Sequence, residues 1–117
     1  MSSKLATFRA YAFDRQRGRC FYCGLPMWDT APQQFACINR LQVTQTAPYG
    51  STAEHLTARR DGGCHRRDNI VAACWHCNQT RHRRKNPPAP DVWKRIQARR
   101  SRKRWERSLA EAEGQAG

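Results

Sequence analysis

The chain has 117 residues, which fits one small domain that buries a limited core and often depends on a bound metal or on disulfides. It carries 22 Lys+Arg against 9 Asp+Glu, a formal net charge of +13. This imbalance predicts a polyanionic partner such as nucleic acid rather than a membrane surface, for which the basic stretch lacks a broad apolar face. The N-terminal residues have no apolar signal segment and no run reaches membrane-spanning length, so we expect a cytoplasmic protein with reduced thiols.

The N-terminal half is predicted to form one helix and one irregular strand. Residues 5–17 carry apolar side chains at helical spacing and end before Gly18, which indicates a short helix whose apolar stripe packs on the core. Residues 35–43 are rich in β-branched and aromatic side chains, which favours an irregular strand.

Residues 51–55 are compatible with two structures. Ser51 and Glu54 have the spacing of a helix capping box, and the residues that follow tolerate a helix. The segment before the turn-prone Asp-Gly-Gly at 61–63 is short, however, and the chemistry described below needs Glu54 and His55 to point in different directions, as neighbours on a strand do. We therefore predict a strand.

The C-terminal half is predicted to contain a second strand and two basic helices. An apolar run at residues 69–73 is the partner of the first strand, and residues 75–85 continue it as a strongly basic helix. A proline-rich linker at residues 86–90 ends that helix. Asp91 then caps a last helix that extends to about residue 113, with a small apolar docking face made by Val92, Trp93 and Ile96.

Two C-x-x-C pairs supply four thiolates, the number that a closed tetrahedral zinc site needs: Cys20, Cys23, Cys74 and Cys77. A redox pair is the competing interpretation, but thioredoxin-like chemistry needs one such pair within a βαβ unit. His65 and His76 are alternative ligands for a site of three cysteines and one histidine, although the paired spacing favours four cysteines. We therefore expect a structural Zn²⁺, and we interpret Cys37 as a buried small side chain and Cys64 as a loop thiol.

Glu54 and His55 supply two groups that phosphodiester hydrolysis requires, a ligand for a divalent cation and a general base for water. Histidine suits the second role because its usual pKa is near neutral. Asn78 and His82 are four residues apart, so in a helix they lie on one face one turn apart. With Glu54 they form a ligand set suited to Mg²⁺ or Mn²⁺, while the imidazole also permits Zn²⁺, Ni²⁺ or Co²⁺.

The second cysteine pair limits where the regular helix can begin. Residues 74, 78 and 82 would share one helical face, and one face cannot readily serve two separate metals. We therefore predict that residues 74–77 form a knuckle at the strand-to-helix junction, which leaves Asn78 and His82 facing the first strand.

The order and spacing of these elements resemble those of the HNH endonucleases, which have a ββα-metal fold. The resemblance rests on Glu54-His55, the Asp-Gly-Gly turn, Asn69 and the run Cys74-Trp-His-Cys77-Asn78. It implies an α+β fold in which a ββα-metal core with a four-cysteine zinc site is flanked by an N-terminal helix and a basic C-terminal helix. The nuclease domain would span residues 1–86, with its core at 20–85, and residues 87–117 would form the linker and the basic helix.

The resemblance also implies roles for individual residues. His55 would be the general base, Asn69 would brace the loop that orients His55, and Glu54, Asn78 and His82 would hold the catalytic metal. Asn78 departs from the commoner histidine, as in the HNN subset of the family, which lowers the preference for transition metals. Glu54 replaces the commoner aspartate, which changes the reach of the carboxylate.

The predicted function is DNA cleavage in a bacterial or phage-encoded protein, and the resemblance implies products with 5′-phosphate and 3′-hydroxyl ends. A zinc-stabilised DNA-binding module without catalysis is the alternative, and an RNA-binding zinc protein is weaker because no clear aromatic platform for bases is present. We expect cations of the C-terminal third to contact DNA phosphates, with affinity that falls steeply with salt: Arg81, Arg83, Arg84, Lys85, Arg99, Arg100, Lys103 and Arg104. Trp93 and Trp105 are expected to pack or stack rather than to read bases.

Overall fold

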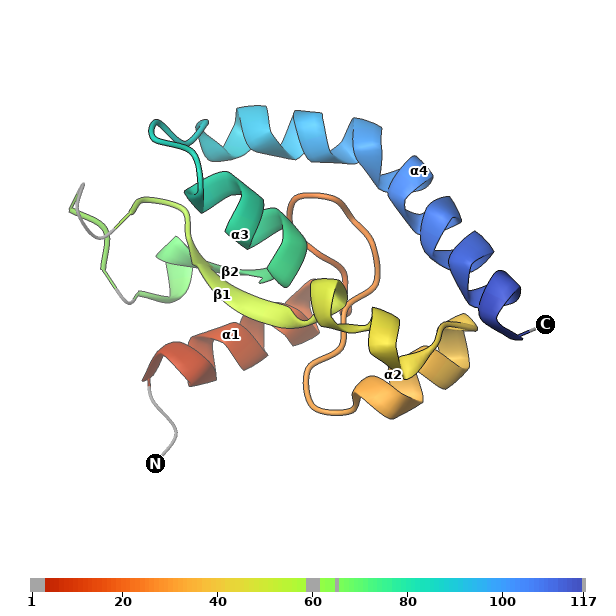
Figure 1. Ribbon diagram of the computed structural model, residues 1–117. Coiled ribbons are helices and arrows are strands. Elements are labelled where there is room, and N and C mark those ends of the chain that lie inside the picture. Colours follow the sequence, from red (N-terminus) through yellow and green to blue (C-terminus); the bar gives the residue numbers. More distant parts are fainter. Residues whose placement is uncertain (1–3, 59–61, 65, 117) are drawn as a thin grey trace.

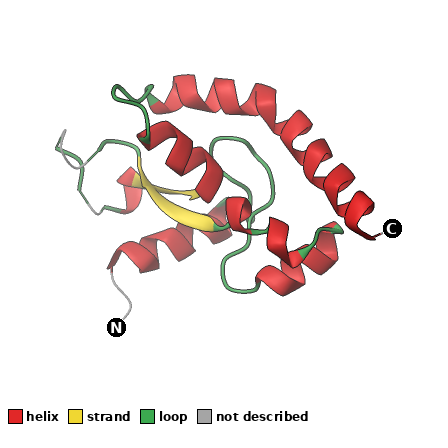
Figure 2. Ribbon diagram, viewed as in Figure 1, coloured by secondary structure: helices red, strands yellow, loops and turns green. Residues whose placement is uncertain are grey.

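The computed structural model describes residues 4–58, 62–64 and 66–116 of the chain. At its centre is an antiparallel hairpin of β1 (Ser51–His55) and β2 (Ile70–Cys74). Helices α1 (Lys4–Arg15) and α3 (Trp75–His82) lie on opposite sides of this hairpin (Figure 1). The long helix α4 (Pro90–Ala116) passes over α3 and extends towards α2 (Pro32–Asn39) (Figure 1), and helices surround the two strands (Figure 2). The predicted α+β class is confirmed, and the arrangement is that of a ββα-metal fold.

The hairpin forms because β2 is an apolar run that can be buried on both faces. Its register pairs Ser51 with Cys74 and His55 with Ile70, and all five residues of β2 are buried. The predicted strand at residues 51–55 is therefore confirmed, since pairing with a buried partner outweighs the local helical propensity. In the loop between the strands, Gly63 donates its N–H to Ala58 O at 2.9 Å, and a Cβ at Gly63 would collide with Thr57 O.

Helix α1 is anchored to β2 by both packing and hydrogen bonds. Ala12 is buried, and Phe13 packs against the same apolar cluster. Just beyond the helix, the Gln16 amide donates to Ala72 O at 2.8 Å and accepts from Ala72 N at 3.0 Å. The predicted N-terminal helix, with its apolar stripe on the core, is thus confirmed.

The predicted strand at residues 35–43 is wrong, because this segment contains α2 followed by short 3-10 turns at Val43–Gln45 and Ala47–Tyr49. A proline in the first turn of α2 suits a helix start, since its missing N–H has no helical partner there. Phe35 and Ala36 are buried in a cluster with Tyr49, and helical spacing lets them face it together. Tertiary packing therefore makes this segment helical although its β-branched composition favours a strand. A further 3-10 turn, Arg67–Asn69, leads into β2.

Helix α4 begins at Pro90, so the prediction that Asp91 caps it is wrong; Asp91 lies inside its first turn. Trp93 is buried and Ile96 packs beside it, as expected, whereas Val92 is exposed. Farther along, α4 contributes Trp105, Leu109 and Ala112 to the cluster that contains Tyr49. The helix thus packs on two apolar clusters along its length. Among the described residues, no helix is long and apolar enough to cross a membrane.

Candidate active site

The two cysteine pairs meet in the interior, between the N-terminal knuckle and the junction of β2 with α3. The four Sγ atoms of Cys20, Cys23, Cys74 and Cys77 lie within 4.8 Å of one another, and all four residues are buried. The Cys23 and Cys74 sulfurs are 3.9 Å apart, close to the separation of about 3.8 Å that tetrahedral thiolates with Zn–S bonds of about 2.3 Å would have. The four cysteines therefore fit a structural zinc ion.

Backbone N–H groups surround the sulfurs, as a thiolate site requires. Cys20 Sγ accepts from Tyr22 N at 3.3 Å and from Cys74 N at 3.3 Å, and Cys74 Sγ accepts from Cys77 N at 3.4 Å. Hydrogen bonds from Cys23 and then from Cys74 hold the pKa of Cys20 far below its usual value, whereas hydrogen bonds with the other cysteines and burial raise the pKa of Cys77. Without a cation the four thiols cannot all ionise together, and a zinc ion would remove that conflict.

Cys74 is the last residue of β2 and the N-cap of α3. Cys74 therefore precedes the regular helix, as predicted, but the predicted knuckle over residues 74–77 is wrong in its extent, because residues 75–77 already form the first turn of α3. His76 is half-buried, and burial, followed by the charge of Arg104, lowers its pKa. His76 is not a member of the cysteine cluster. The other alternative ligand, His65, and Asp61 of the predicted turn lie outside the described residues. Cys37 is exposed, so its predicted burial is wrong, while Cys64 is an exposed loop thiol as expected.

Helix α4 touches the cysteine site directly. The Trp93 indole donates to Cys77 O at 3.0 Å, and the buried Gln97 side chain accepts from Cys77 Sγ at 3.7 Å. The Arg104 guanidinium donates to Cys23 Sγ at 3.2 Å and lies 3.8 Å from Cys74 Sγ. Arg104, which the sequence places among the DNA contacts, is thus turned towards the sulfurs.

The Glu54 carboxylate is the centre of a second polar cluster, on the side of the hairpin that faces α3. Its side chain is 3% exposed, so its charge needs partners within the protein. His82 Nε2 lies 2.8 Å from Oε1 and 3.1 Å from Oε2. Arg81 donates to Oε2 at 3.2 Å, and the Tyr22 hydroxyl donates to Oε2 at 3.0 Å. Burial, and then the charge of Glu54, raise the pKa of the Tyr22 phenol, which keeps the hydroxyl a donor.

Asn78 lies one turn before His82 on the same face of α3. Its Nδ2 donates to Thr52 Oγ1 at 2.9 Å and to Ala53 O at 3.3 Å. Because a backbone carbonyl only accepts, these bonds fix the orientation of the amide and leave Oδ1 on the side away from these strand acceptors. Asn78 and His82 from α3 and Glu54 from β1 thus face the space between these two elements.

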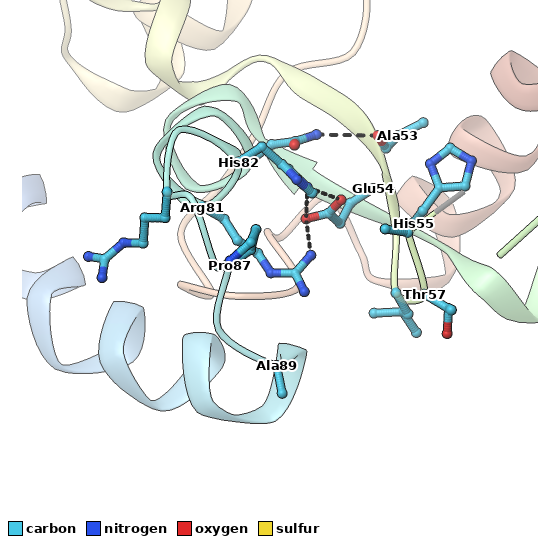
Figure 3. A pocket seen from close by; sticks show the side chains of 12 residues that line it. Ala53, Glu54, His55, Thr57, Arg81, His82, Pro87 and Ala89 are labelled. Atoms are coloured by element: carbon cyan, nitrogen blue, oxygen red, sulfur yellow. Dashed lines mark hydrogen bonds and ion pairs between the residues drawn. The ribbon is translucent and has the colours of Figure 1, made fainter. Parts of the chain in front are cut away.

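These residues line an open pocket of about 690 Å³. Its walls come from β1 and the following loop, from α3, and from the linker to α4: Ala53, Glu54, His55, Leu56, Thr57, Ala58, Asn78, Arg81, His82, Arg84, Pro87 and Ala89. Figure 3 shows Glu54 and His82 directed at each other inside it, with Arg81 beside the carboxylate.

The contact between Glu54 Oε1 and His82 Nε2 is a hydrogen bond, and its length is also close to the spacing of two ligands of one cation. Two adjacent ligands of a cation with bonds of about 2.1 Å lie about 3 Å apart, and the Oε1 to Nε2 distance is 2.8 Å.

His55 lines the same pocket from the next position of β1, and its ring points away from Glu54 (Figure 3). The two neighbours therefore point in different directions, as the strand prediction requires. Asn69 bonds to the loop that follows His55: its Oδ1 accepts from Thr57 N at 2.8 Å, and its Nδ2 donates to Thr57 O at 3.1 Å and to Cys64 O at 3.0 Å. These bonds close the loop onto the start of β2.

The basic residues expected to bind DNA divide into two groups. Arg81 is buried against Glu54 and also donates from Nε to Pro88 O at 3.0 Å, so it is not a surface cation. The others, apart from Arg104, are exposed on the end of α3, the segment that follows it and α4: Arg83, Arg84, Lys85, Arg99, Arg100 and Lys103. Arg84 lies at the pocket, with its guanidinium 4.8 Å from the Trp93 ring centroid.

Two contacts at the site are missing from the sequence-based prediction, those of Tyr22 and Arg81 with Glu54. They join positions that are 32 and 27 residues apart, so no local pattern reveals them. The available hints are that Tyr22 lies inside the first cysteine pair and that Arg81 directly precedes His82.

The β1–β2 hairpin leads through a cysteine pair into α3, and a polar pocket lies between β1 and α3. This arrangement defines a zinc-type ββα-metal protein. A model of the HNH endonuclease family matches residues 20–84, more than half of the chain. The chain therefore belongs to the HNH endonuclease family. No curated protein and no solved structure matches it. The matched region contains both cysteine pairs and the pocket residues from β1 and α3, and it ends before α4.

Proposed function

We propose that the chain is a metal-dependent DNA endonuclease whose active site is the pocket between β1 and α3. The observation that carries the proposal is the buried Glu54 carboxylate, 2.8 Å from His82 Nε2, in a pocket that His55 and Asn78 also line. A buried acidic group with a histidine and an amide at an open pocket is costly for stability and is typical of a catalytic site.

His55 acts as the general base that takes a proton from water. The resulting hydroxide attacks phosphorus, the bond from phosphorus to the 3′ oxygen breaks, and the products carry 5′-phosphate and 3′-hydroxyl ends. Asn69 positions His55 by bracing the loop at Thr57. A divalent cation held by Glu54, Asn78 and His82, Mg²⁺ or Mn²⁺ before Zn²⁺, Ni²⁺ or Co²⁺, would offset the negative charge on the phosphate and the leaving oxygen.

Exposed cations near the pocket and along α4 bind the DNA backbone. Arg83, Arg84 and Lys85 follow α3, with Arg84 at the pocket, and a second group extends along α4: Arg99, Arg100 and Lys103. With a net charge of +13, these contacts supply affinity and steering without sequence readout.

The alternative is a zinc-stabilised DNA-binding module without catalysis. One observation favours it: Arg81 and His82 satisfy the Glu54 carboxylate within the protein. Such a module would keep the cysteine site and the basic helix but would not need His55 at the pocket.

Incubation of supercoiled plasmid with the purified chain separates the two functions. We expect nicked plasmid with Mg²⁺ or Mn²⁺ and none when a chelator removes the added cation while the zinc stays bound. A His76→Ala variant is the control for substitution of the proposed base His55. His76 is not among the residues that line the pocket, so this variant should nick normally. A gel shift without nicking at any tested cation would establish the module instead.

A further inference from the structure

The two oxygens of the Glu54 carboxylate have different surroundings. Oε2 accepts from the Tyr22 hydroxyl at 3.0 Å and from Arg81 at 3.2 Å, and it lies 3.1 Å from His82 Nε2. Oε1 lies 2.8 Å from His82 Nε2 and has no other hydrogen-bond partner among the described residues. One oxygen is therefore engaged by the protein interior and the other faces the proposed ligand histidine.

Tyr22 reaches Glu54 from the zinc knuckle. Its backbone N–H donates to Cys20 Sγ at 3.3 Å, and its ring packs edge-on against Phe21 with centroids 5.3 Å apart. The side chain is buried, so its hydroxyl has little freedom to turn elsewhere. The first cysteine pair thus fixes the position of a hydrogen-bond donor to the carboxylate.

Arg81 approaches the same oxygen from α3. Its Nε donates to Pro88 O at 3.0 Å, and its guanidinium lies 5.9 Å from the Tyr22 ring centroid. The cation is buried, and the carboxylate is its ion-pair partner. Arg81 therefore balances the charge of Glu54 and also joins it to the linker that forms one wall of the pocket.

Resting on the proposed function, we infer that Tyr22 and Arg81 are positioning residues that hold Oε2 of Glu54 and leave Oε1 as the oxygen that binds the catalytic cation. The pair gives Glu54 one ligand atom in a fixed direction, towards His82. Because Tyr22 belongs to the zinc knuckle and donates to Glu54, the position of the knuckle affects the orientation of the Glu54 carboxylate. The two metal sites are therefore coupled within one small core.

Tyr22→Phe tests this inference, because it removes the hydroxyl and keeps the ring. Substitution of Arg81 is less informative, since a buried carboxylate without its cation can unfold the chain. Tyr49→Phe is the matched control: Tyr49 is equally buried, and its hydroxyl is 2.6 Å from Ser108 Oγ, in the other apolar cluster. Both variants lose one tyrosine hydrogen bond.

The measurement is the Mn²⁺ dissociation constant of the zinc-loaded chain, followed by electron paramagnetic resonance of free Mn²⁺. Loss of a group that orients a metal ligand typically lowers metal affinity by about 10-fold or more. We expect that increase in dissociation constant for Tyr22→Phe and no change for Tyr49→Phe, with zinc content unchanged in both. The single-turnover cleavage rate should fall in Tyr22→Phe alone.

Glu54→Ala separates the two ways of failing. Because it leaves the buried Arg81 without its carboxylate, its Mn²⁺ binding is compared with wild type at a temperature at which zinc content and circular dichroism show that the variant is folded. If Glu54→Ala abolishes Mn²⁺ binding but Tyr22→Phe binds Mn²⁺ as Tyr49→Phe does, the inference is overturned and the proposed cation site stands. If Mn²⁺ binding does not depend on Glu54 at all, both the inference and the proposed site are overturned.

Discussion

Replacement of Trp93 tests whether α4, which lies outside the region matched to the family, is part of the folded core. Trp93 is 1% exposed and its indole donates to Cys77 O at 3.0 Å. Removal of a buried tryptophan side chain costs about 3–5 kcal/mol, and the loss of the hydrogen bond leaves a buried carbonyl without that donor. Since whole domains are stable by roughly 5–15 kcal/mol, Trp93→Ala should remove a large share of the total.

Urea denaturation in the presence of zinc measures this loss. With an m-value of about 1.5 kcal/mol/M, a loss of about 3 kcal/mol lowers the urea midpoint by about 2 M. Trp75→Ala is the matched control, since Trp75 is 42% exposed, and it should change stability by about 0.5 kcal/mol or less. Equal midpoints for the two variants would refute the view that α4 docks on the cysteine site.

Three further predictions concern zinc, DNA and the loop after β1. Cys77→Ser should lower the zinc content measured by elemental analysis and unfold the chain at a lower temperature, because a closed tetrahedral site loses one of its four ligands; full zinc content in the folded variant would contradict this. Substitution of Arg99, Arg100 and Lys103 on α4 by glutamine should reduce the slope of log affinity against log salt by nearly 3, at about 0.9 for each phosphate contact. Arg40→Gln, at the exposed residue that follows α2, should not alter that slope. Asn69→Ala removes three hydrogen bonds to the loop and should slow single-turnover cleavage by about 10-fold or more with little change in DNA affinity; a loss of binding without a loss of rate would argue against its bracing role.

The parts of the fold that sequence could predict are those encoded by short spacings. The cysteine pairs locate the zinc site and the start of α3, and the alternation between Glu54 and His55 identifies a strand once its apolar partner is recognised. Asn78 and His82 share a face because they are one helical turn apart. In each case the information lies within a few residues.

The parts that sequence could not predict depend on contacts between distant segments. Helix α2 forms where composition favours a strand, because Phe35 is buried against Tyr49 and α4 covers the same cluster. Arg104 looks like a surface cation of a basic helix, yet its guanidinium lies 3.2 Å from Cys23 Sγ, 81 residues away in the sequence. A thiolate site attracts a cation from whichever element passes over it, and no local pattern states which one does.

The most direct test of the proposed activity is the single-turnover cleavage rate of a labelled duplex by His55→Ala at saturating Mn²⁺ and DNA. General-base catalysis contributes about 100-fold to 10,000-fold, so the rate should fall by at least the lower figure. The dissociation constants for Mn²⁺ and DNA should stay at their wild-type values, because Glu54, Asn78, His82 and the exposed arginines are unchanged. A cleavage rate equal to that of the wild type would contradict the assignment of His55 and of the pocket as the active site.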